Sequence, residues 1–350
     1  MASTQSWKFF LSRHGADEPL QNVLDGLLRV CSKIATALRG TDVKALGQHN
    51  AFGDEQLTVD VLAEQLLRGY AEEEKSIKAV SSEEETPLKE CNEEGDFILC
   101  WDPLDGSSIV DCNWSVGTIV GIWRLQHHNI SWKGKETLVH QTGRQQVAAL
   151  VVVYGPQTTA VVALNPQRQQ SGVKQAQRID EDGGMEGEGG KPIVNLRLTD
   201  GDIVVVGEPH IRPAAKIFSP ANLRATQDLP AYQQLVKYWM EKKFTLRYTG
   251  GVVPDVYQIF IKQQGVFCNP ASKAAPAKLR MCFEVLPLAL LVEAAGGKTS
   301  DGKMSLLSVP IEHMDHRTPF CCGSADEVQR FEDTLAKATA ATFDGGVKLL

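Results

Sequence analysis

The sequence contains no apolar run approaching the roughly 20 residues that a membrane-spanning helix needs. Its first 13 residues also lack the long apolar segment of a secretory signal. Basic residues are not in excess, because 36 Lys and Arg stand against 43 Asp and Glu, a formal charge of −7. Such a balance gives no general nucleic-acid-binding surface. We therefore expect neither a membrane nor a nucleic acid as a partner.

Cysteine is sparse, with eight residues in a chain of 350. This density is too low for a disulfide scaffold, and no Cys-x-x-Cys or Cys/His cluster indicates a zinc site. We expect reduced cysteines that pack as small core residues. The expected location is cytoplasmic. A plastid or a peroxisome-like organelle stays open, although neither a transit peptide nor a terminal Ser-Lys-Leu is seen.

The rest of the composition, 43% hydrophobic and 23% charged, is that of a globular protein of enzyme size. Apolar residues recur at helical spacing from Leu20 to Leu38, and Gly40 is a plausible end of that helix. Shorter stretches show the same pattern, and a capping-box spacing at Ser324 predicts a final helix. The further helices are predicted at Val59 to Leu67, Pro230 to Lys243 and Glu284 to Ala295.

Apolar, β-branched segments alternate with these helices and predict strands. Residues 166–191 are rich in Gln, Gly and Glu, which favours a loop or a boundary between halves, and Ile203 to Val206 is expected to begin a second strand set. The fold class is therefore α/β (α+β) with layered sheets. We divide the chain at residues 1–200 and 201–350. The first strands are predicted at Phe97 to Trp101, Thr118 to Trp123, Val147 to Tyr154 and Val161 to Leu164, the last two as a hairpin.

The turn from Asp102 to Ser108 is the most informative segment. Two aspartates three residues apart follow an apolar strand, and Gly106-Ser107-Ser108 adds backbone N–H groups and hydroxyls. Hard cations such as Mg²⁺ prefer oxygen ligands, and donors beside them can hold a phosphate. The alternative is an ordinary Asx turn. We favour the metal and phosphate site, because unpaired carboxylates at a buried strand end are costly.

A second phosphatase pattern, the Asp-x-Asp-Gly nucleophile of haloacid-dehalogenase enzymes, does not fit. Asp105-Gly106-Ser107 would supply its second half, but Pro103 stands where that chemistry needs a nucleophilic carboxylate.

Four motifs in order resemble the fructose-1,6-bisphosphatase and sedoheptulose-1,7-bisphosphatase family, over about residues 20 to 335. They are Phe52-Gly53-Asp54-Glu55-Gln56, Ser82-Glu83-Glu84, Trp101-Asp102-Pro103-Leu104-Asp105-Gly106-Ser107-Ser108 and Lys278-Leu279-Arg280-Met281-Cys282-Phe283-Glu284. The resemblance implies a layered α-β-α-β-α fold and a Mg²⁺-dependent phosphatase that removes the 1-phosphate of a sugar bisphosphate. It implies a metal and 1-phosphate domain at residues 1–200 and a sugar and distal-phosphate domain at 201–350.

The resemblance also assigns roles residue by residue, with two or three Mg²⁺ per subunit. The implied metal ligands are Glu83, Asp102, the Leu104 carbonyl, Asp105 and Glu284. Asp54 and Glu83 match contacts of a further, looser metal, and Asp60 and Glu84 match the pair that helps to activate water. The implied 1-phosphate site is Gly106, Ser107, Ser108 and Arg280. The implied distal-phosphate site is Asn222, Arg247, Tyr248, Asn269 and Lys278.

Arg247 matches an arginine that reaches this pocket across a subunit interface, which implies a homodimer or a homotetramer. Asn269 and Ala225 stand where fructose-specific relatives usually have tyrosine, so the seven-carbon branch of the family is favoured. A fructose-specific or dual-specificity enzyme, an inositol-monophosphatase-like enzyme and a catalytically inactive sugar-phosphate sensor are the alternatives.

Overall fold

The computed structural model describes residues 6–49, 55–125, 130–165, 190–199 and 201–344. Within these residues the chain forms a large eight-stranded sheet, a five-stranded sheet and a small hairpin, β1 (Ala45–His49) with β2 (Glu55–Leu57). No helix among the described residues has the length and apolar character to cross a membrane.

The eight-stranded sheet has the order β10-β9-β8-β7-β6-β5-β3-β4. Its neighbours are antiparallel except β3 and β5, which run parallel. β7 is buried along its whole length because helices cover both faces of the sheet. The strands are β3 (Ile77–Ser82), β4 (Lys89–Glu90), β5 (Phe97–Asp105), β6 (Val116–Arg124), β7 (Gln146–Tyr154), β8 (Thr158–Leu164), β9 (Ile193–Leu198) and β10 (Ile203–Gly207).

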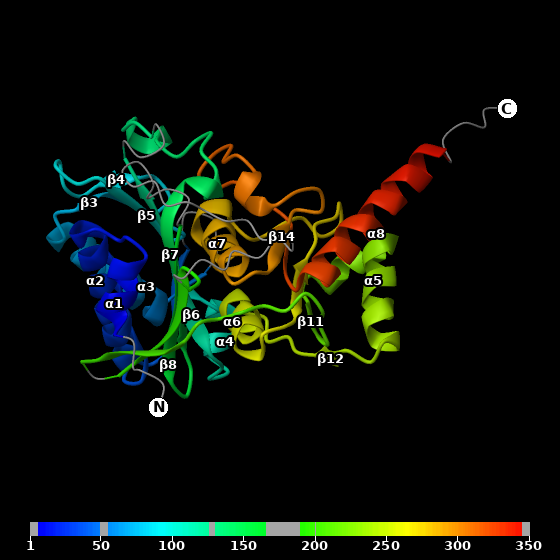
Figure 1. Ribbon diagram of the computed structural model, residues 1–350, viewed down its shortest axis with the longest axis horizontal. Helices are drawn as coiled ribbons and strands as arrows, with labels where there is room; N and C mark the ends of the chain where they lie inside the picture. The colour runs from blue at the N-terminus through cyan, green and yellow to red at the C-terminus, as the bar shows by residue number, and fades with distance from the viewer. Residues whose placement is uncertain (1–5, 50–54, 126–129, 166–189, 200, 345–350) are drawn as a thin grey trace.

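One face of this sheet is covered by α1 (Trp7–Arg13), α2 (Glu18–Leu38) and α3 (Thr58–Glu73), as Figure 1 shows. The helix predicted from the apolar spacing at Leu20 to Leu38 is confirmed as α2. It begins after Asp17, whose carboxylate accepts the backbone N–H of Leu20 at 3.3 Å.

The opposite face packs on α6 (Val252–Lys262) and α7 (Leu286–Ala294). α7 is apolar on all sides, which is expected of a helix buried between two sheets. The sequence pattern places this helix from Glu284, but the structure begins it two residues later, after the π-helical turn η6 (Met281–Val285).

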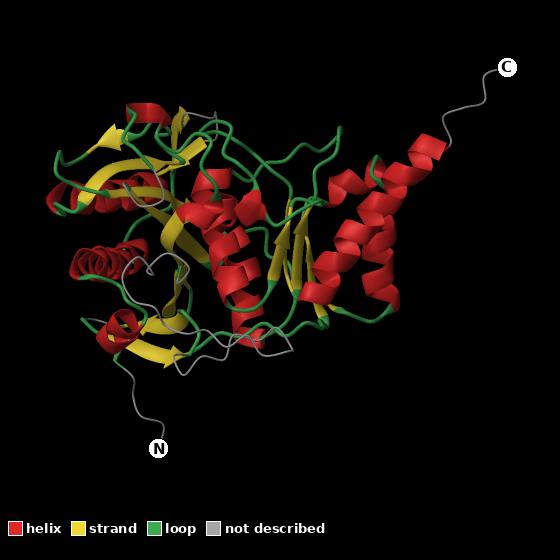
Figure 2. Ribbon diagram, turned by 45° about the horizontal axis from the view of Figure 1, so that its top comes forward, coloured by secondary structure: helices red, strands yellow, loops and turns green. Residues whose placement is uncertain are grey.

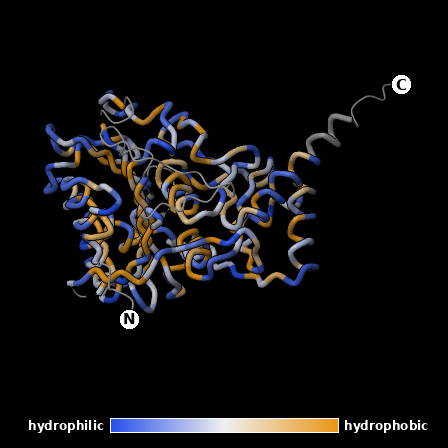
Figure 3. Tube along the Cα trace, viewed as in Figure 1, coloured by the Kyte–Doolittle hydropathy of each residue, from blue (hydrophilic) through white to orange (hydrophobic). Residues whose placement is uncertain are grey.

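The second sheet has the order β12-β11-β13-β15-β14, and α5 and α8 cover its outer side. Figure 2 shows the resulting alternation of helical and strand layers, and Figure 3 shows apolar residues concentrated inside them. The α-β-α-β-α fold is therefore confirmed. The elements are β11 (Ile217–Pro220), β12 (Thr245–Leu246), β13 (Val266–Asn269), β14 (Lys298–Ser300), β15 (Phe320–Gly323), α5 (Pro230–Glu241) and α8 (Ala325–Asp344).

One strand assignment is wrong. Ile203 to Val206 does not begin a second strand set, because β10 pairs antiparallel with β9 as the edge of the first sheet. The second sheet begins at β11. Most of the loop predicted at 166–191 lies outside the described residues, and the division at 200 stays a prediction.

Candidate active site

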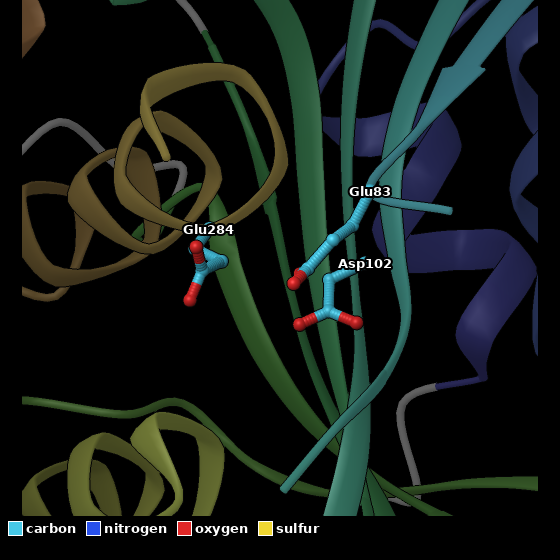
Figure 4. Close-up of side chains that lie close together, drawn as sticks. All are labelled: Glu83, Asp102 and Glu284. Atoms are coloured by element: carbon cyan, nitrogen blue, oxygen red, sulfur yellow. The ribbon is translucent and has the colours of Figure 1, made fainter. Parts of the chain in front are cut away.

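Three carboxylates that are far apart in the sequence converge between the first sheet and the middle helices. Glu83, Asp102 and Glu284 each offer an oxygen within 4.8 Å of the others. In Figure 4 Glu83 and Asp102 extend from adjacent strand ends, and Glu284 faces them from the helical segment opposite. This convergence is what the sequence pattern alone could not establish.

Parallel pairing brings Glu83 beside Asp102. Ser82 is the register partner of Trp101, and the Glu83 N–H donates to the Trp101 carbonyl at 3.1 Å. The two acidic residues therefore leave the same edge of the sheet one residue beyond a fixed pair. The strand predicted at Phe97 to Trp101 is confirmed as the start of β5.

Glu284 is fixed by the π-helical turn that precedes α7. Its carboxylate accepts the backbone N–H of Arg280 at 2.7 Å. The side chain of Arg280 pairs with Glu83 on the facing strand end.

The irregular last part of β5, Asp102 to Asp105, and the turn after it combine both of the interpretations that the sequence allows. The Asp102 carboxylate accepts the Leu104 N–H at 3.0 Å, as in an Asx turn, and also joins the acidic cluster. Gly106 has a φ of 104°, and a Cβ there would lie 2.9 Å from the Val116 side chain. Only glycine suits this position, which sends the chain into the short helix α4 (Ser107–Val110).

Asp105 has a different environment from the three clustered carboxylates. Its oxygens accept the N–H groups of Val252 and Val253, at 3.2 and 2.7 Å, at the start of α6. This places a negative charge at a helix N-terminus. It also ties the turn of the first sheet to the segment that carries Arg247 and Tyr248.

The two residues expected to act on water lie beside this turn. Asp60 is buried at the start of α3, where it accepts the hydroxyl of Ser107 at 2.9 Å and the N–H of Leu57 at 2.9 Å. Glu84 accepts the side-chain amide of Gln56. Asp54 lies outside the described residues, so its expected role stays a prediction.

The electrostatic environment of the site favours neutral carboxyls. Burial raises the pKa of Asp102 and of Glu284 well above their ordinary values, and the neighbouring Glu83 adds to both shifts. Burial likewise raises the pKa of Asp105 to about 7 and that of Asp60 to about 6. Ionising these groups together requires positive charge close by.

The residues present fit a hard divalent cation. The cluster offers only oxygen donors, at least two of them buried, and carboxylates in such a group are stabilised when a cation lies between them.

The raised pKa values predict how the metal-free protein responds to acid. Between about pH 4 and pH 7 the folded chain holds protons on these carboxyls that the unfolded chain releases, so folding is stabilised by acidification and weakened as pH rises. We expect the metal-free melting temperature to rise by about 2 °C or more from pH 8 to pH 6, measured by calorimetry.

Magnesium supplies the control for this prediction, because a cation binds the ionised carboxylates. At 10 mM Mg²⁺ we expect the gain on acidification to shrink or reverse. A metal-free melting temperature that falls steadily from pH 8 to pH 6 would contradict the assignment of raised pKa values to this cluster.

The residues expected around the distal phosphate follow three neighbouring parallel strands of the second sheet. β11 pairs in parallel with both β12 and β13. Arg247 and Tyr248 follow β12, Asn222 follows β11, and Asn269 ends β13. The carboxyl ends of parallel strands meet at one sheet edge, where α/β proteins commonly bind ligands.

These residues differ in burial and in the hydrogen bonds that their side chains form. The Asn222 amide donates to the Pro270 and Ala275 carbonyls at 2.8 and 3.1 Å, which joins the loops after β11 and β13. Arg247 and Tyr248 are exposed, and so is Lys278 in the segment leading to η6. Their phosphate-binding roles stay predictions.

Sequence reasoning missed Asp255, a fully buried carboxylate on α6. It accepts the N–H groups of Thr249, at 2.8 and 3.1 Å, and of Gly250, at 3.2 Å, and so shapes the loop after Tyr248. Burial raises its pKa to about 6. No sequence pattern marked this aspartate as buried, and a single aspartate usually lies at the surface.

Comparison with known proteins agrees with this geometry. The family models of the fructose-1-6-bisphosphatase N-terminal and C-terminal domains match residues 8–180 and 211–336. A chloroplastic sedoheptulose-1,7-bisphosphatase of Triticum aestivum is 42% identical over 328 residues, 93% of this chain and 75% of that protein. The chain belongs to the fructose-1,6-bisphosphatase family.

Other relatives in the family include both sugar specificities. A class 1 fructose-1,6-bisphosphatase of Pelobacter propionicus is 32% identical, with 90% of each chain covered. A crystal structure from Toxoplasma gondii, assigned as a sedoheptulose-1,7 bisphosphatase, is 59% identical with a TM-score of 0.87, covering 95% of this chain and 99% of that chain. A Leishmania major fructose-1,6-bisphosphatase, 23% identical with a TM-score of 0.81 and the same coverages, shares the fold.

Membership confirms the expected class of enzyme, a phosphoric monoester hydrolase of the sugar bisphosphatase type. Enzymes of this family use divalent metal ions, in agreement with the acidic cluster of Glu83, Asp102 and Glu284.

Proposed function

We propose that the protein removes the 1-phosphate of sedoheptulose 1,7-bisphosphate, giving sedoheptulose 7-phosphate and inorganic phosphate, with Mg²⁺ at the acidic cluster. The observation that carries the proposal is the convergence of Glu83, Asp102 and Glu284 beside the buried Arg280. A cation-binding group next to a guanidinium is the arrangement that a phosphate monoester requires.

The ligands proposed for two or three Mg²⁺ are Glu83, Asp102, the Leu104 carbonyl, Asp105 and Glu284, with Asp54 at the loosest ion. Bound Mg²⁺ supplies positive charge that offsets the phosphate dianion. Ser107, Ser108 and the Gly106 backbone are proposed to orient the 1-phosphate. Asp60 and Glu84 are proposed to take up a proton from the attacking water, and the pKa of about 6 at Asp60 suits that role near neutral pH.

The proposed specificity depends on the second sheet. We place the distal phosphate at Asn222, Tyr248, Asn269 and Lys278. Arg247 comes from a second subunit, so the active enzyme is a homodimer or a homotetramer. Ala225, buried in the turn after Asn222, and Asn269 are smaller than the tyrosines that fructose-specific relatives usually have there, and we propose that this difference suits a longer sugar. The presence of proteins named sedoheptulose-1,7-bisphosphatase among the relatives also supports the seven-carbon substrate for this chain.

Steady-state phosphate release with Mg²⁺ tests the substrate. We expect kcat/KM for sedoheptulose 1,7-bisphosphate to exceed that for fructose 1,6-bisphosphate by about 10-fold or more, the discrimination that 1.4 kcal/mol gives. A clear preference for the six-carbon sugar would instead support the fructose-specific alternative.

The same panel separates the other classes of function. Faster hydrolysis of inositol monophosphates, with a bisphosphate KM unchanged by Lys278→Ala, would favour an inositol-monophosphatase-like enzyme. Binding of sugar phosphates without any Mg²⁺-dependent phosphate release would favour a sensor.

A further inference from the structure

A buried glutamate on α3 contacts the two strand ends that carry acidic residues of the site. Glu64 is 9% exposed. Its Oε2 accepts the indole N–H of Trp101 at 2.8 Å, and its Oε1 accepts the hydroxyl of Ser82 at 2.9 Å. Trp101 immediately precedes Asp102, and Ser82 immediately precedes Glu83.

Side chains alternate between the two faces of a strand, so Glu64 can contact Trp101 and Ser82 on one face while Asp102 and Glu83 lie on the other. Trp101 packs in the core on the α1–α3 side of the sheet, whereas Asp102, the next residue, points to the opposite face and joins Glu284. Glu64 therefore binds β3 and β5 on the sheet face that α1–α3 cover, and Glu83 and Asp102 point to the opposite face, toward α7.

Arg68 completes this anchor. It forms an ion pair with Glu64 one helical turn away, and its side chain is 17% exposed. It also contacts the Glu85 carboxylate at 3.1 Å. Ser82 and Glu85 exchange two further bonds, Glu85 N–H to Ser82 Oγ at 2.9 Å and Ser82 N–H to the Glu85 carbonyl at 3.1 Å. The turn that contains Glu83 is thus fixed at both ends.

An apolar residue at position 64 would fill the space but leave the Trp101 N–H and the Ser82 hydroxyl without this acceptor. Buried donors that lose their partner cost more than the bond itself contributes. The strand ends would then shift to find other partners, and the spacing of the metal-binding oxygens would shift with them.

We propose that Glu64 is a positioning residue that fixes the spacing of Glu83 and Asp102 by holding Ser82 and Trp101. The inference deepens the proposed function, since it assigns a determinant of divalent-cation affinity to a side chain that touches neither metal nor substrate.

Glu64→Gln tests the proposal with little change in volume. The amide keeps one acceptor oxygen but loses the charge opposite Arg68. Titration calorimetry of Mg²⁺ into the metal-free protein should show about 10-fold weaker binding, the effect typical of residues that orient metal ligands. Half-saturating Mg²⁺ for phosphate release should rise equally, while KM for the sugar bisphosphate at saturating Mg²⁺ stays within about twofold. Unchanged calorimetric affinity would overturn the proposal.

Trp101→Phe provides a second route to the same interaction, because it removes the indole donor and keeps an aromatic ring in the core. It too should weaken Mg²⁺ binding. Since both changes break one contact, the Glu64→Gln/Trp101→Phe double variant should bind Mg²⁺ more tightly than the two single losses predict when added. Fully additive losses would show that Glu64 does not act through Trp101.

Two control variants separate positioning from general loss of stability. Asp25→Asn removes a pair of the same i,i+4 spacing on α2, Asp25 with Arg29 at 2.7 Å, which is more exposed than Glu64 with Arg68. Leu67→Ala opens a cavity in α3 at a fully buried position. Both should leave Mg²⁺ affinity within about twofold at a temperature where each variant is folded. A loss in Leu67→Ala as large as that in Glu64→Gln would reduce Glu64 to a purely structural residue.

The readouts keep this inference apart from the proposed function. The choice of sugar is decided by wild-type kinetics alone, and the role of Glu64 by calorimetry of Mg²⁺ binding without substrate. Wild-type protein that binds Mg²⁺ with an affinity that Glu64→Gln leaves unchanged would overturn only the role of Glu64, whereas wild-type protein that binds no Mg²⁺ would overturn both proposals.

Discussion

Asp102→Asn should reduce phosphate release from the sugar bisphosphate by about 10³-fold or more. The substitution keeps the shape of the side chain and its acceptor for the Leu104 N–H but removes one charge from the acidic cluster. Cation-mediated stabilisation in a phosphatase supplies several kcal/mol, and each 1.4 kcal/mol is a factor of ten in rate. Release of inorganic phosphate at saturating Mg²⁺, with Mg²⁺ calorimetry beside it, measures the loss.

Stability should move in the opposite direction to activity. Burial raises the pKa of Asp102, and the carboxylates around it raise this pKa further, so Asp102 destabilises the folded metal-free chain at high pH. We expect the metal-free melting temperature of Asp102→Asn at pH 8 to equal or exceed that of the wild type. Misfolding would lower both quantities together.

Asp96→Asn is the matched control. Asp96 immediately precedes the same strand at its other end, where it pairs with Arg124 at 2.6 Å, with 41% of its side chain exposed. Its activity should stay within about twofold of wild type, since exposed pairs contribute little. If Asp102→Asn retained more than a tenth of wild-type activity, the acidic cluster would not be the catalytic metal site.

The local parts of this site could be predicted from sequence because each depends on neighbouring residues. The apolar run before Asp102 predicts a buried strand, and Gly106 marks the turn that ends it, although the strand continues past Pro103 to Asp105. The long periodicity of α2 gave its position almost to the residue.

The convergence could not be read in the same way. Glu83 and Arg280 lie 197 residues apart and meet only because β3 pairs with β5 and α7 packs across the same sheet. The role of Glu64 was hidden for a related reason. A glutamate four residues before an arginine is typical of an exposed helix face, and only the fold brings Trp101 to its carboxylate.

The error at β10 has a local cause. Ile203 to Val206 is a short valine-rich run that reads as a strand in any sheet, and no local pattern reports which partner it pairs with. In the structure it pairs with β9, and Thr199 and Asp202 exchange backbone hydrogen bonds at 3.0 and 3.2 Å between the two strands.

Arg280→Met should raise the KM for the sugar bisphosphate by about 10²-fold or more. The Arg280 side chain is 5% exposed and pairs with Glu83, and its Nε lies 3.7 Å from Asp315. Methionine keeps the apolar stem and removes the charge and the forked donors that suit a phosphate. Removing one partner of a desolvated charged contact costs about 2–5 kcal/mol, which corresponds to this change in KM.

The matched control is Arg317→Met. Arg317 contacts the same Asp315 at 3.4 Å, but 34% of its side chain is exposed. Its KM should stay within about threefold of wild type. A KM for Arg280→Met in that same range would remove Arg280 from the phosphate site.

The sign of the effect on metal affinity separates Arg280 from Asp102. The guanidinium repels a cation at Glu83, so its removal should leave Mg²⁺ affinity unchanged or tighter while inhibition by inorganic phosphate weakens. Asp102→Asn should instead weaken Mg²⁺ binding. If Arg280→Met weakened Mg²⁺ and phosphate binding equally, Arg280 would act by holding Glu83 in place and not by receiving the substrate's charge.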